Sequence, residues 1–155
     1  MLKNVCTLLA LASLLVIHGV GMAEPMERND NEKIVHDFIA AWSSLDSELL
    51  ADYFDDDGVY HNMPSQAVRG KANIQRFIAG FTAQWESTDW QIITSLAQGD
   101  TVVVERLDIT VVDGQEVRLP CFGIFELKKG KIVSWRDYFD LSTYIDALGK
   151  SAAQA

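Results

Sequence analysis

An acidic residue, Asp137, stands in the middle of an apolar strand face near the end of the chain. Residues 133–140 have the pattern of a strand, in which alternation places Asp137 between Trp135 and Phe139 on one face. An ionised carboxylate in that position is costly unless it is paired or hydrogen-bonded. The pattern therefore predicts that Asp137 has polar partners from elsewhere in the chain.

Residues 101–111 repeat this anomaly. Alternation puts Arg106 and Asp108 on one face of a predicted strand, next to apolar residues. If this strand lies in the same sheet as Asp137, one planar guanidinium stands between two carboxylates and can donate to both. Two coupled acids can divide the roles of general acid and general base. The alternative is a buried ion-pair network that only fixes the strand register, and spacing alone leaves both interpretations open.

Tyr60 and Asn62 form a second candidate pair. They share one face of a short predicted strand, 59–62, which Pro64 ends, while His61 points away. By spacing alone, the favoured interpretation is a tyrosine packed under a loop and an asparagine that caps a turn.

Helices are predicted before the strands. One begins at about residue 32, with Asp30 or Asn31 as its cap, and a shorter one follows it. A third helix follows Gly70, and its apolar side is made of Ile74, Phe77, Ile78 and Phe81.

Period-two alternation then predicts a meander of long strands. The turns Asp113-Gly114 and Lys129-Gly130 separate its last members, and a closing helix over 141–148 ends at Gly149. The strands cover 90–96, 101–111, 117–127 and the segment that contains Asp137. Helices followed by a strand meander predict an α+β fold, in which helices cover one face of a curved antiparallel sheet.

Composition excludes several classes of function. The 155 residues are 48% hydrophobic, which fits one globular domain, and the net charge of −9 argues against a nucleic-acid partner. There is no phosphate loop, nucleotide fingerprint or nucleophile elbow, and His36, His61 and Cys121 lack a metal-ligand spacing. The acidic run at 55–57 lacks the rest of a calcium loop and is interpreted as a solvated turn. We therefore expect a site without a cofactor or metal.

The first 23 residues have the pattern of a secretory signal peptide. Lys3 precedes an apolar run that is short for a membrane span, and small residues follow this run. An uncleaved anchor, or a start of translation at Met22 or Met26, is the alternative. We expect export to the periplasm or the exterior, which leaves Cys121 without a disulfide partner in the chain. The predicted parts are a signal over 1–23, a flexible lead-in over 24–31, a domain over 32–149 and a tail over 150–155.

Three separated motifs carry a family resemblance. They are Tyr60-His61-Asn62-Met63-Pro64, Glu105-Arg106-Leu107-Asp108 and Trp135-Arg136-Asp137-Tyr138-Phe139-Asp140-Leu141. In this order they resemble the signatures of the limonene-1,2-epoxide hydrolase family, and the likeness extends from about Glu32 to Leu148. It implies the cone-shaped α+β fold shared with nuclear transport factor two, ketosteroid isomerases and polyketide cyclases. In that fold, N-terminal helices pack over a deep apolar pocket. The resemblance also implies a homodimer.

The resemblance also implies a role for each polar residue. Asp137 is the expected general base that deprotonates a water molecule, and Tyr60 and Asn62 hold that water with it. Asp108 is the expected general acid that protonates the epoxide oxygen, and Arg106 bridges the two acids. The implied reaction is the cofactor-free addition of water to a small apolar epoxide, which gives a vicinal diol without a covalent intermediate.

The substrate is left open by the sequence. We expect apolar side chains to line the pocket, namely Trp135, Phe139, Leu119, Phe122, Ile78 and Phe81. The segments after Pro64 and around Cys121 differ from the limonene enzyme, so the resemblance does not name the epoxide. Two other classes of function stay open. One is a non-catalytic protein that binds an apolar ligand, and the other is an isomerase or cyclase that uses Asp137 as a base toward carbon.

Overall fold

The computed structural model describes residues 30–152, with side chains over 30–149. The predicted export signal, 1–23, and residues 24–29 of the predicted lead-in lie outside the described residues. Among the helices of the described part, none is long and apolar enough to cross a membrane.

Three α-helices precede the long strand meander in the described chain, and a fourth follows it. Helix α1 spans Asp30–Ala41 and runs into a 3-10 turn, η1, at Trp42–Ser44, while α2 spans Ser47–Asp52, α3 spans Lys71–Phe81 and α4 spans Leu141–Ala152. Asp46 caps α2, because its carboxylate accepts hydrogen bonds from the backbone amides of Glu48 and Leu49. Gly149 does not end α4 as predicted, since a glycine inside a helix costs only about 1 kcal/mol.

Six strands form one sheet. They are β1 (Phe54–Asn62), β2 (Val68–Arg69), β3 (Trp85–Gln98), β4 (Thr101–Val112), β5 (Gln115–Lys128) and β6 (Lys131–Phe139), in the order β2-β1-β6-β5-β4-β3. The antiparallel meander from β3 to β6 confirms the prediction. The sheet is not antiparallel throughout, however, because β1 joins β6 in parallel. The predicted α+β class is confirmed.

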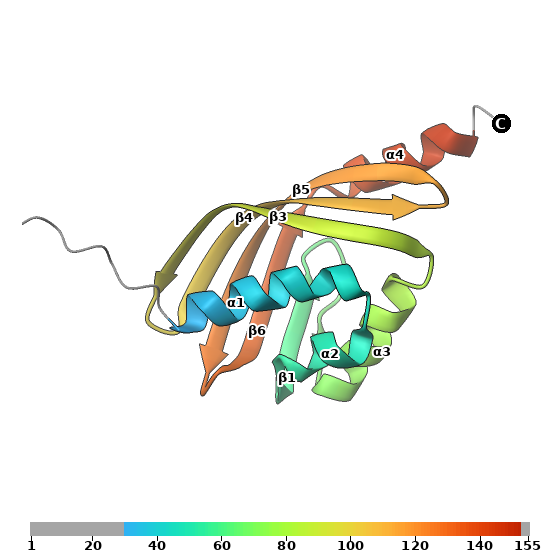
Figure 1. The fold of residues 1–155 in the computed structure, drawn as a ribbon. Coiled ribbons are helices and arrows are strands. Elements are labelled where there is room, and N and C mark those ends of the chain that lie inside the picture. The colour runs from blue at the N-terminus through green and yellow to red at the C-terminus, as the bar shows by residue number, and fades with distance from the viewer. Residues whose placement is uncertain (1–29, 153–155) are drawn as a thin grey trace, which may run out of the picture.

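The sheet curves around α1, while α2 and α3 lie beside β1 (Figure 1). The core fills the space between the sheet and the helices. Phe38 of α1 meets the rings of Phe54, Phe125 and Trp135 at centroid distances of 5.7, 6.1 and 5.2 Å. All four side chains are fully buried, so aromatic packing holds α1 against three different strands.

Two irregularities decide which side chains of β1 and β6 face inward. In β1, residues 55–58 oppose only Val133 of β6, so the acidic run predicted as a turn is a bulge within a strand. In β6, the pairing with β5 shifts by one residue at Val133. A shift of one residue exchanges the two faces of a strand. Ile132 is therefore in the core, although alternation counted back from Trp135 would place Val133 there.

Candidate active site

Arg106 joins Asp108 and Asp137 across the sheet. The first two residues lie on β4 and the third on β6. The Arg106 guanidinium donates to both oxygens of Asp108, from Nε at 2.8 Å and Nη2 at 3.1 Å. It also donates to both oxygens of Asp137, from Nη1 at 2.9 Å and Nη2 at 2.6 Å. The predicted arrangement of one guanidinium between two carboxylates is therefore present.

This charged cluster is buried. Arg106 is 0% exposed, and the two acids are 6% and 3% exposed. The ring of Trp90 lies 4.5 Å from the Arg106 guanidinium carbon, and the ring of Trp135 lies 5.6 Å from it. Indole faces attract a cation, so the protein provides both charge pairing and aromatic contact for a guanidinium withdrawn from water.

Tyr60 and Asn62 lie beside this cluster. In the parallel pairing of β1 with β6, Tyr60 is opposite Trp135 and Asn62 is opposite Asp137. The ring of Tyr60 stacks on Trp135 at a centroid distance of 4.2 Å and an angle of 4°. Asn62 Oδ1 is buried and has no hydrogen-bond partner among the described residues. Buried acceptors are normally satisfied, so this oxygen is available to a bound water or ligand.

Burial separates the acid–base properties of the polar groups. It raises the pKa of Asp108 to about 6, against the opposing effect of the Arg106 charge. Burial, together with the charge of Asp137, also raises the pKa of the Tyr60 hydroxyl well above its usual value. Burial lowers the pKa of Arg106, but the two carboxylates outweigh it, so the pKa stays well above that of a free guanidinium. Asp108 can therefore carry a proton near neutral pH, while Tyr60 remains a hydroxyl.

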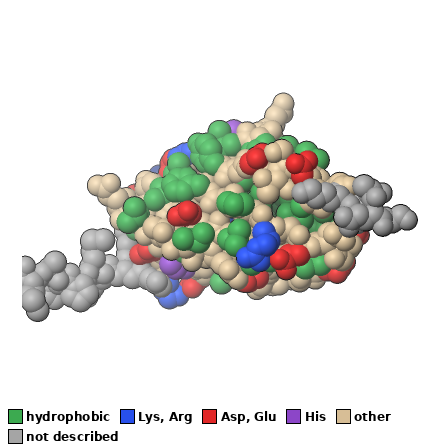
Figure 2. Space-filling model, turned by 90° about the horizontal axis from the view of Figure 1, so that it is seen from above, with side chains coloured by type: hydrophobic (Ala, Val, Ile, Leu, Met, Phe, Trp, Pro, Cys, Tyr) green, Lys and Arg blue, Asp and Glu red, His purple; other side chains and the backbone are tan. Residues whose placement is uncertain are grey.

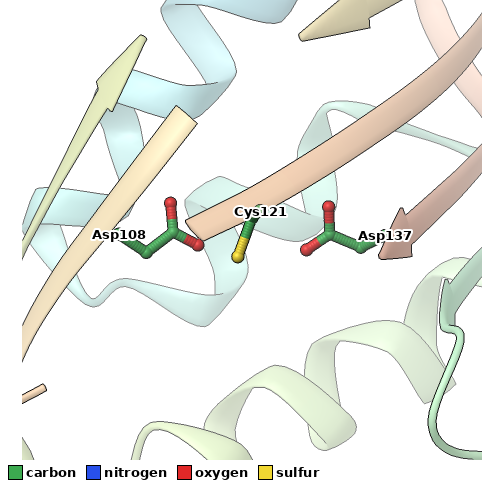
Figure 3. Close-up of side chains that lie close together, drawn as sticks. All are labelled: Asp108, Cys121 and Asp137. Carbon is green, nitrogen blue, oxygen red and sulfur yellow. The ribbon is translucent and has the colours of Figure 1, made fainter. Parts of the chain in front are cut away.

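Cys121 of β5 lies between the two acids (Figure 3). Its sulfur and one oxygen of each carboxylate lie within 4.8 Å of one another, a spacing that could hold a metal ion. Arg106, however, already donates to all four carboxylate oxygens and supplies the positive charge of the site. Burial and the charge of Asp108 raise the pKa of the Cys121 thiol, which disfavours the thiolate that metals bind. These contacts argue for a guanidinium site, and the absence of a metal stays a prediction.

The polar cluster opens into a largely apolar cavity. Three of the predicted lining residues, Phe81, Leu119 and Phe139, do line it. Ile78 and Trp135 are fully buried core residues behind the wall instead. Phe122 was assigned to the wrong face, because it alternates with Cys121 on β5 and is 42% exposed on the outer side.

Several lining residues were missed by the sequence prediction. They are Trp85, Trp90, Thr110, Val117, Cys121, Leu141 and Tyr144. The position of the Asp113-Gly114 turn could have predicted some of them, because it sets the pairing of the strands on either side. A two-residue turn pairs Val112 with Gln115, and continuing that register places Cys121 opposite Arg106. No comparable signal placed Leu141 and Tyr144, because helix α4 has no register with the sheet.

Comparison with known proteins assigns this chain to a family. The model of the SnoaL-like domain matches residues 35–135. The chain belongs to the SnoaL-like family. It is 30% identical over 110 residues to the epoxide hydrolase EphG of Mycobacterium tuberculosis (strain ATCC 25618 / H37Rv). The aligned region covers 69% of this chain and 71% of EphG. The resemblance to the limonene-1,2-epoxide hydrolase family is thus confirmed at modest identity.

Solved structures similar to this SnoaL-like chain share its fold. An LEH-like epoxide hydrolase of M. tuberculosis has a TM-score of 0.69 at 25% identity, covering 80% of this chain and 92% of that chain. SalBIII, an epoxide hydrolase/cyclase-like enzyme with a role in pyran ring formation in salinomycin, has a TM-score of 0.65 at 15% identity. That match covers 73% of this chain and 92% of SalBIII. Because the identity is low, it shows a shared fold and nothing more. The predicted cone fold is confirmed.

Proposed function

We propose that this SnoaL-like protein is a cofactor-independent epoxide hydrolase that converts a small apolar epoxide to a vicinal diol. The observation that carries the proposal is the bridge from Asp108 through Arg106 to Asp137 at an apolar cavity. The similarity to EphG, an epoxide hydrolase, supports the same reaction class.

Asp137 is the proposed general base. It takes a proton from a water molecule while the water oxygen attacks one carbon of the epoxide ring. Asn62 lies opposite Asp137 in the sheet and offers its unpartnered Oδ1 as an acceptor for the other water proton. Tyr60 keeps its hydroxyl proton, because burial raises its pKa, and can donate a hydrogen bond to the water oxygen. Three groups thus orient one nucleophile.

Asp108 is the proposed general acid. As the ring C–O bond breaks, its proton passes to the departing oxygen, so that both hydroxyls of the diol are neutral. The raised pKa of about 6 gives Asp108 a protonated fraction near neutral pH. Arg106 then stabilises the carboxylate that remains, and a proton returns from Asp137 to Asp108 through solvent before the next turnover. Each proton transfer contributes roughly 10²–10⁴-fold to the rate.

The proposal is tested with Asp137→Asn and a panel of terpene, styrene and cyclohexene epoxides. The amide cannot accept the water proton, so diol formation should fall by at least about 10²-fold while the fold is kept. Asp140→Asn is the matched control, because this exposed carboxylate lies three residues further along and outside the cavity. An Asp137→Asn protein as active as the wild type would overturn the mechanism.

Isotopically labelled water distinguishes direct attack from a covalent ester. In a single turnover, direct attack puts the label into the diol, whereas an enzyme ester would give an unlabelled first product. Loss of epoxide with formation of a cyclic ether or a carbonyl isomer would favour cyclase or isomerase chemistry. Tight binding without turnover would favour a binding protein.

We also propose that the protein is a homodimer, as the family resemblance implies. Phe122 and Tyr138 are direct partners on β5 and β6, and they are 42% and 40% exposed on the outer side of the sheet. In the view from above, hydrophobic side chains are spread over the surface, with acidic and basic side chains between them (Figure 2). A second copy of this chain is the proposed partner of the outer sheet face.

A further inference from the structure

Arg106 reaches its second acid by crossing a whole strand. It belongs to β4, whereas Asp137 belongs to β6, and β5 lies between these two strands. Neighbouring strands lie about 4.8 Å apart, so the side chains of Arg106 and Asp137 together span roughly 10 Å over the backbone of β5. The side chains of β5 at the crossing point therefore decide whether the bridge can form.

The two inward positions of β5 at this point carry small residues. Cys121 is opposite Arg106, and Gly123 is opposite Asp137. A Cβ atom on Gly123 would lie 3.0 Å from Nη1 of Arg106 and 3.2 Å from Nε1 of Trp135. Nη1 is the atom that donates to Asp137 Oδ1 at 2.9 Å. The missing side chain of Gly123 thus provides the space in which the hydrogen-bonding nitrogen lies.

The neighbours of Gly123 have little freedom to retreat. Its Cβ would also meet Cε2 of Phe125 at 2.8 Å, closer than real Cβ contacts. The rings of Phe125 and Trp135 are stacked at 5.2 Å, and both side chains are fully buried. Trp90 lies over the Arg106 guanidinium at 4.5 Å. Because the core is close-packed, an added methyl group would displace the guanidinium rather than be absorbed.

We propose that Gly123 is a positioning residue, which lets Arg106 lie flat across β5 and hold Asp137 through two hydrogen bonds. This inference rests on the proposed epoxide hydrolysis for its effect on rate. Gly123 touches no reacting atom. It acts through Arg106, which fixes the orientation of the proposed base toward the water.

The test is Gly123→Ala, measured as kcat and KM for the best epoxide of the panel. We expect kcat to fall about 10- to 100-fold with little change in KM, since small misplacements of catalytic groups have effects of this size. Gly80→Ala is the control, as a Cβ there has no neighbour within 4 Å.

A purely structural role would give a different result. In that case Gly123→Ala would lower the melting temperature but leave kcat per folded molecule unchanged. The double variant Gly123→Ala/Arg106→Lys adds a second test, because a lysine has no Nη1 to be displaced. In the Arg106→Lys background, we expect Gly123→Ala to lower kcat by less than about 3-fold. An equal loss of kcat in the wild-type and Arg106→Lys backgrounds would overturn the inference.

A crystal structure of Gly123→Ala separates this inference from the proposed function. The Nη1–Oδ1 contact between Arg106 and Asp137 should be broken or lengthened beyond hydrogen-bonding distance. An unchanged contact would contradict the positioning role even if the wild-type protein hydrolyses epoxides. A wild-type protein that forms no diol from any epoxide would contradict the proposed function and leave this structural result standing.

Discussion

Asp108 and Asp137 are held by the same guanidinium but have different neighbours. Asp108 accepts a hydrogen bond from the Cys121 thiol and lies next to Leu119 and Trp90 in the cavity wall. Asp137 lies opposite Asn62 instead, whose amide oxygen has no hydrogen-bond partner in the described part of the chain. One acid thus faces the apolar space in which a substrate oxygen would lie, and the other faces groups that can hold water. Unequal surroundings of this kind divide two like residues into an acid and a base.

The raised pKa of Asp108 predicts a pH dependence of the rate. As the proposed general acid, Asp108 must carry its proton, so kcat/KM should fall as the pH rises through about 6. The expected alkaline limb loses about 10-fold in rate for each further pH unit. The measurement is diol formation by the wild type between pH 5 and 8. A profile that stays flat over that range would contradict Asp108 as the acid.

The same shift predicts a pH dependence of stability. The folded protein holds the Asp108 proton up to a pH of about 6, whereas the unfolded chain releases it near 3.8. The stability that Asp108 contributes is therefore fully present below pH 3.8 and is lost as the pH rises through 6. The difference is about 3 kcal/mol at 1.36 kcal/mol for each pKa unit.

Denaturant unfolding of the wild type and Asp108→Asn at pH 4 and 7.5 measures this difference. The wild type should lose free energy of unfolding relative to the variant between the two pH values. If both proteins change by the same amount, the titration of Asp108 is not the cause.

At the scale of elements, the bulge at Val133 decides the side of the sheet on which Asp137 lies. Lys128 pairs with Lys131 at the turn, and continuing that register would place Asp137 opposite Phe122 on the outer face. The extra residue shifts the register by one and brings Asp137 opposite Gly123 on the inner face. The sequence has no glycine or proline that marks this bulge. Alternation still placed Asp137 correctly, because it was counted from Trp135, beyond the bulge.

Strand β1 has its own bulge at residues 55–58, opposite Val133 of β6, and Gly58 lets the backbone adopt it. A Cβ on Gly58 would lie 2.9 Å from the carbonyl oxygen of Asp55 and 3.1 Å from that of Ile132. Both are backbone atoms, which cannot swing aside as a flexible side chain can. Gly58→Ala should therefore lower the free energy of unfolding by about 1–3 kcal/mol. It should also reduce diol formation, because β1 carries Tyr60 and Asn62.

Chemical denaturation and the epoxide assay together check the Gly58→Ala prediction. Gly149→Ala serves as the control and should not lower the free energy of unfolding, since a Cβ at that helical glycine has no neighbour within 4 Å and alanine favours a helix over glycine by about 1 kcal/mol. A Gly58→Ala protein as stable and as active as the wild type would show that β1 tolerates a different path.

For the whole molecule, the proposed dimer predicts a change in assembly. Phe122→Glu would put a charge on the outer face of β5, and burying it against a second copy is unfavourable. The variant should shift from dimer to monomer in sedimentation or light scattering, with its unfolding little changed. Leu49→Glu on α2 is matched in exposure, at 43% against 42%, and should leave the assembly unchanged. A wild-type protein that is monomeric at high concentration would refute the dimer.

Much of this molecule followed from the sequence because its signals are local. Alternation and the Asp113-Gly114 turn predicted the strand meander, and charged residues on apolar faces predicted the cluster around Arg106. The rest depends on contacts between distant segments. Nothing local indicates that β1 lies parallel to β6, and without the family motifs Tyr60 and Asn62 had no reason to join the site. Gly123 and Cys121 were missed because their importance comes from an arginine on another strand.

The pairing of β1 with β6 joins the first long strand of the sheet to its last strand. On the ribosome, Tyr60 and Asn62 emerge long before their partners Trp135 and Asp137. Contacts between segments so distant in sequence carry a large loop-closure entropy and form late. A nascent chain that ends before β6 can form the β3–β5 hairpins, but it lacks the strand with which Tyr60 and Asn62 pair. Completion of the proposed catalytic centre should therefore coincide with the end of folding, and we expect a partly folded chain to carry no partial activity.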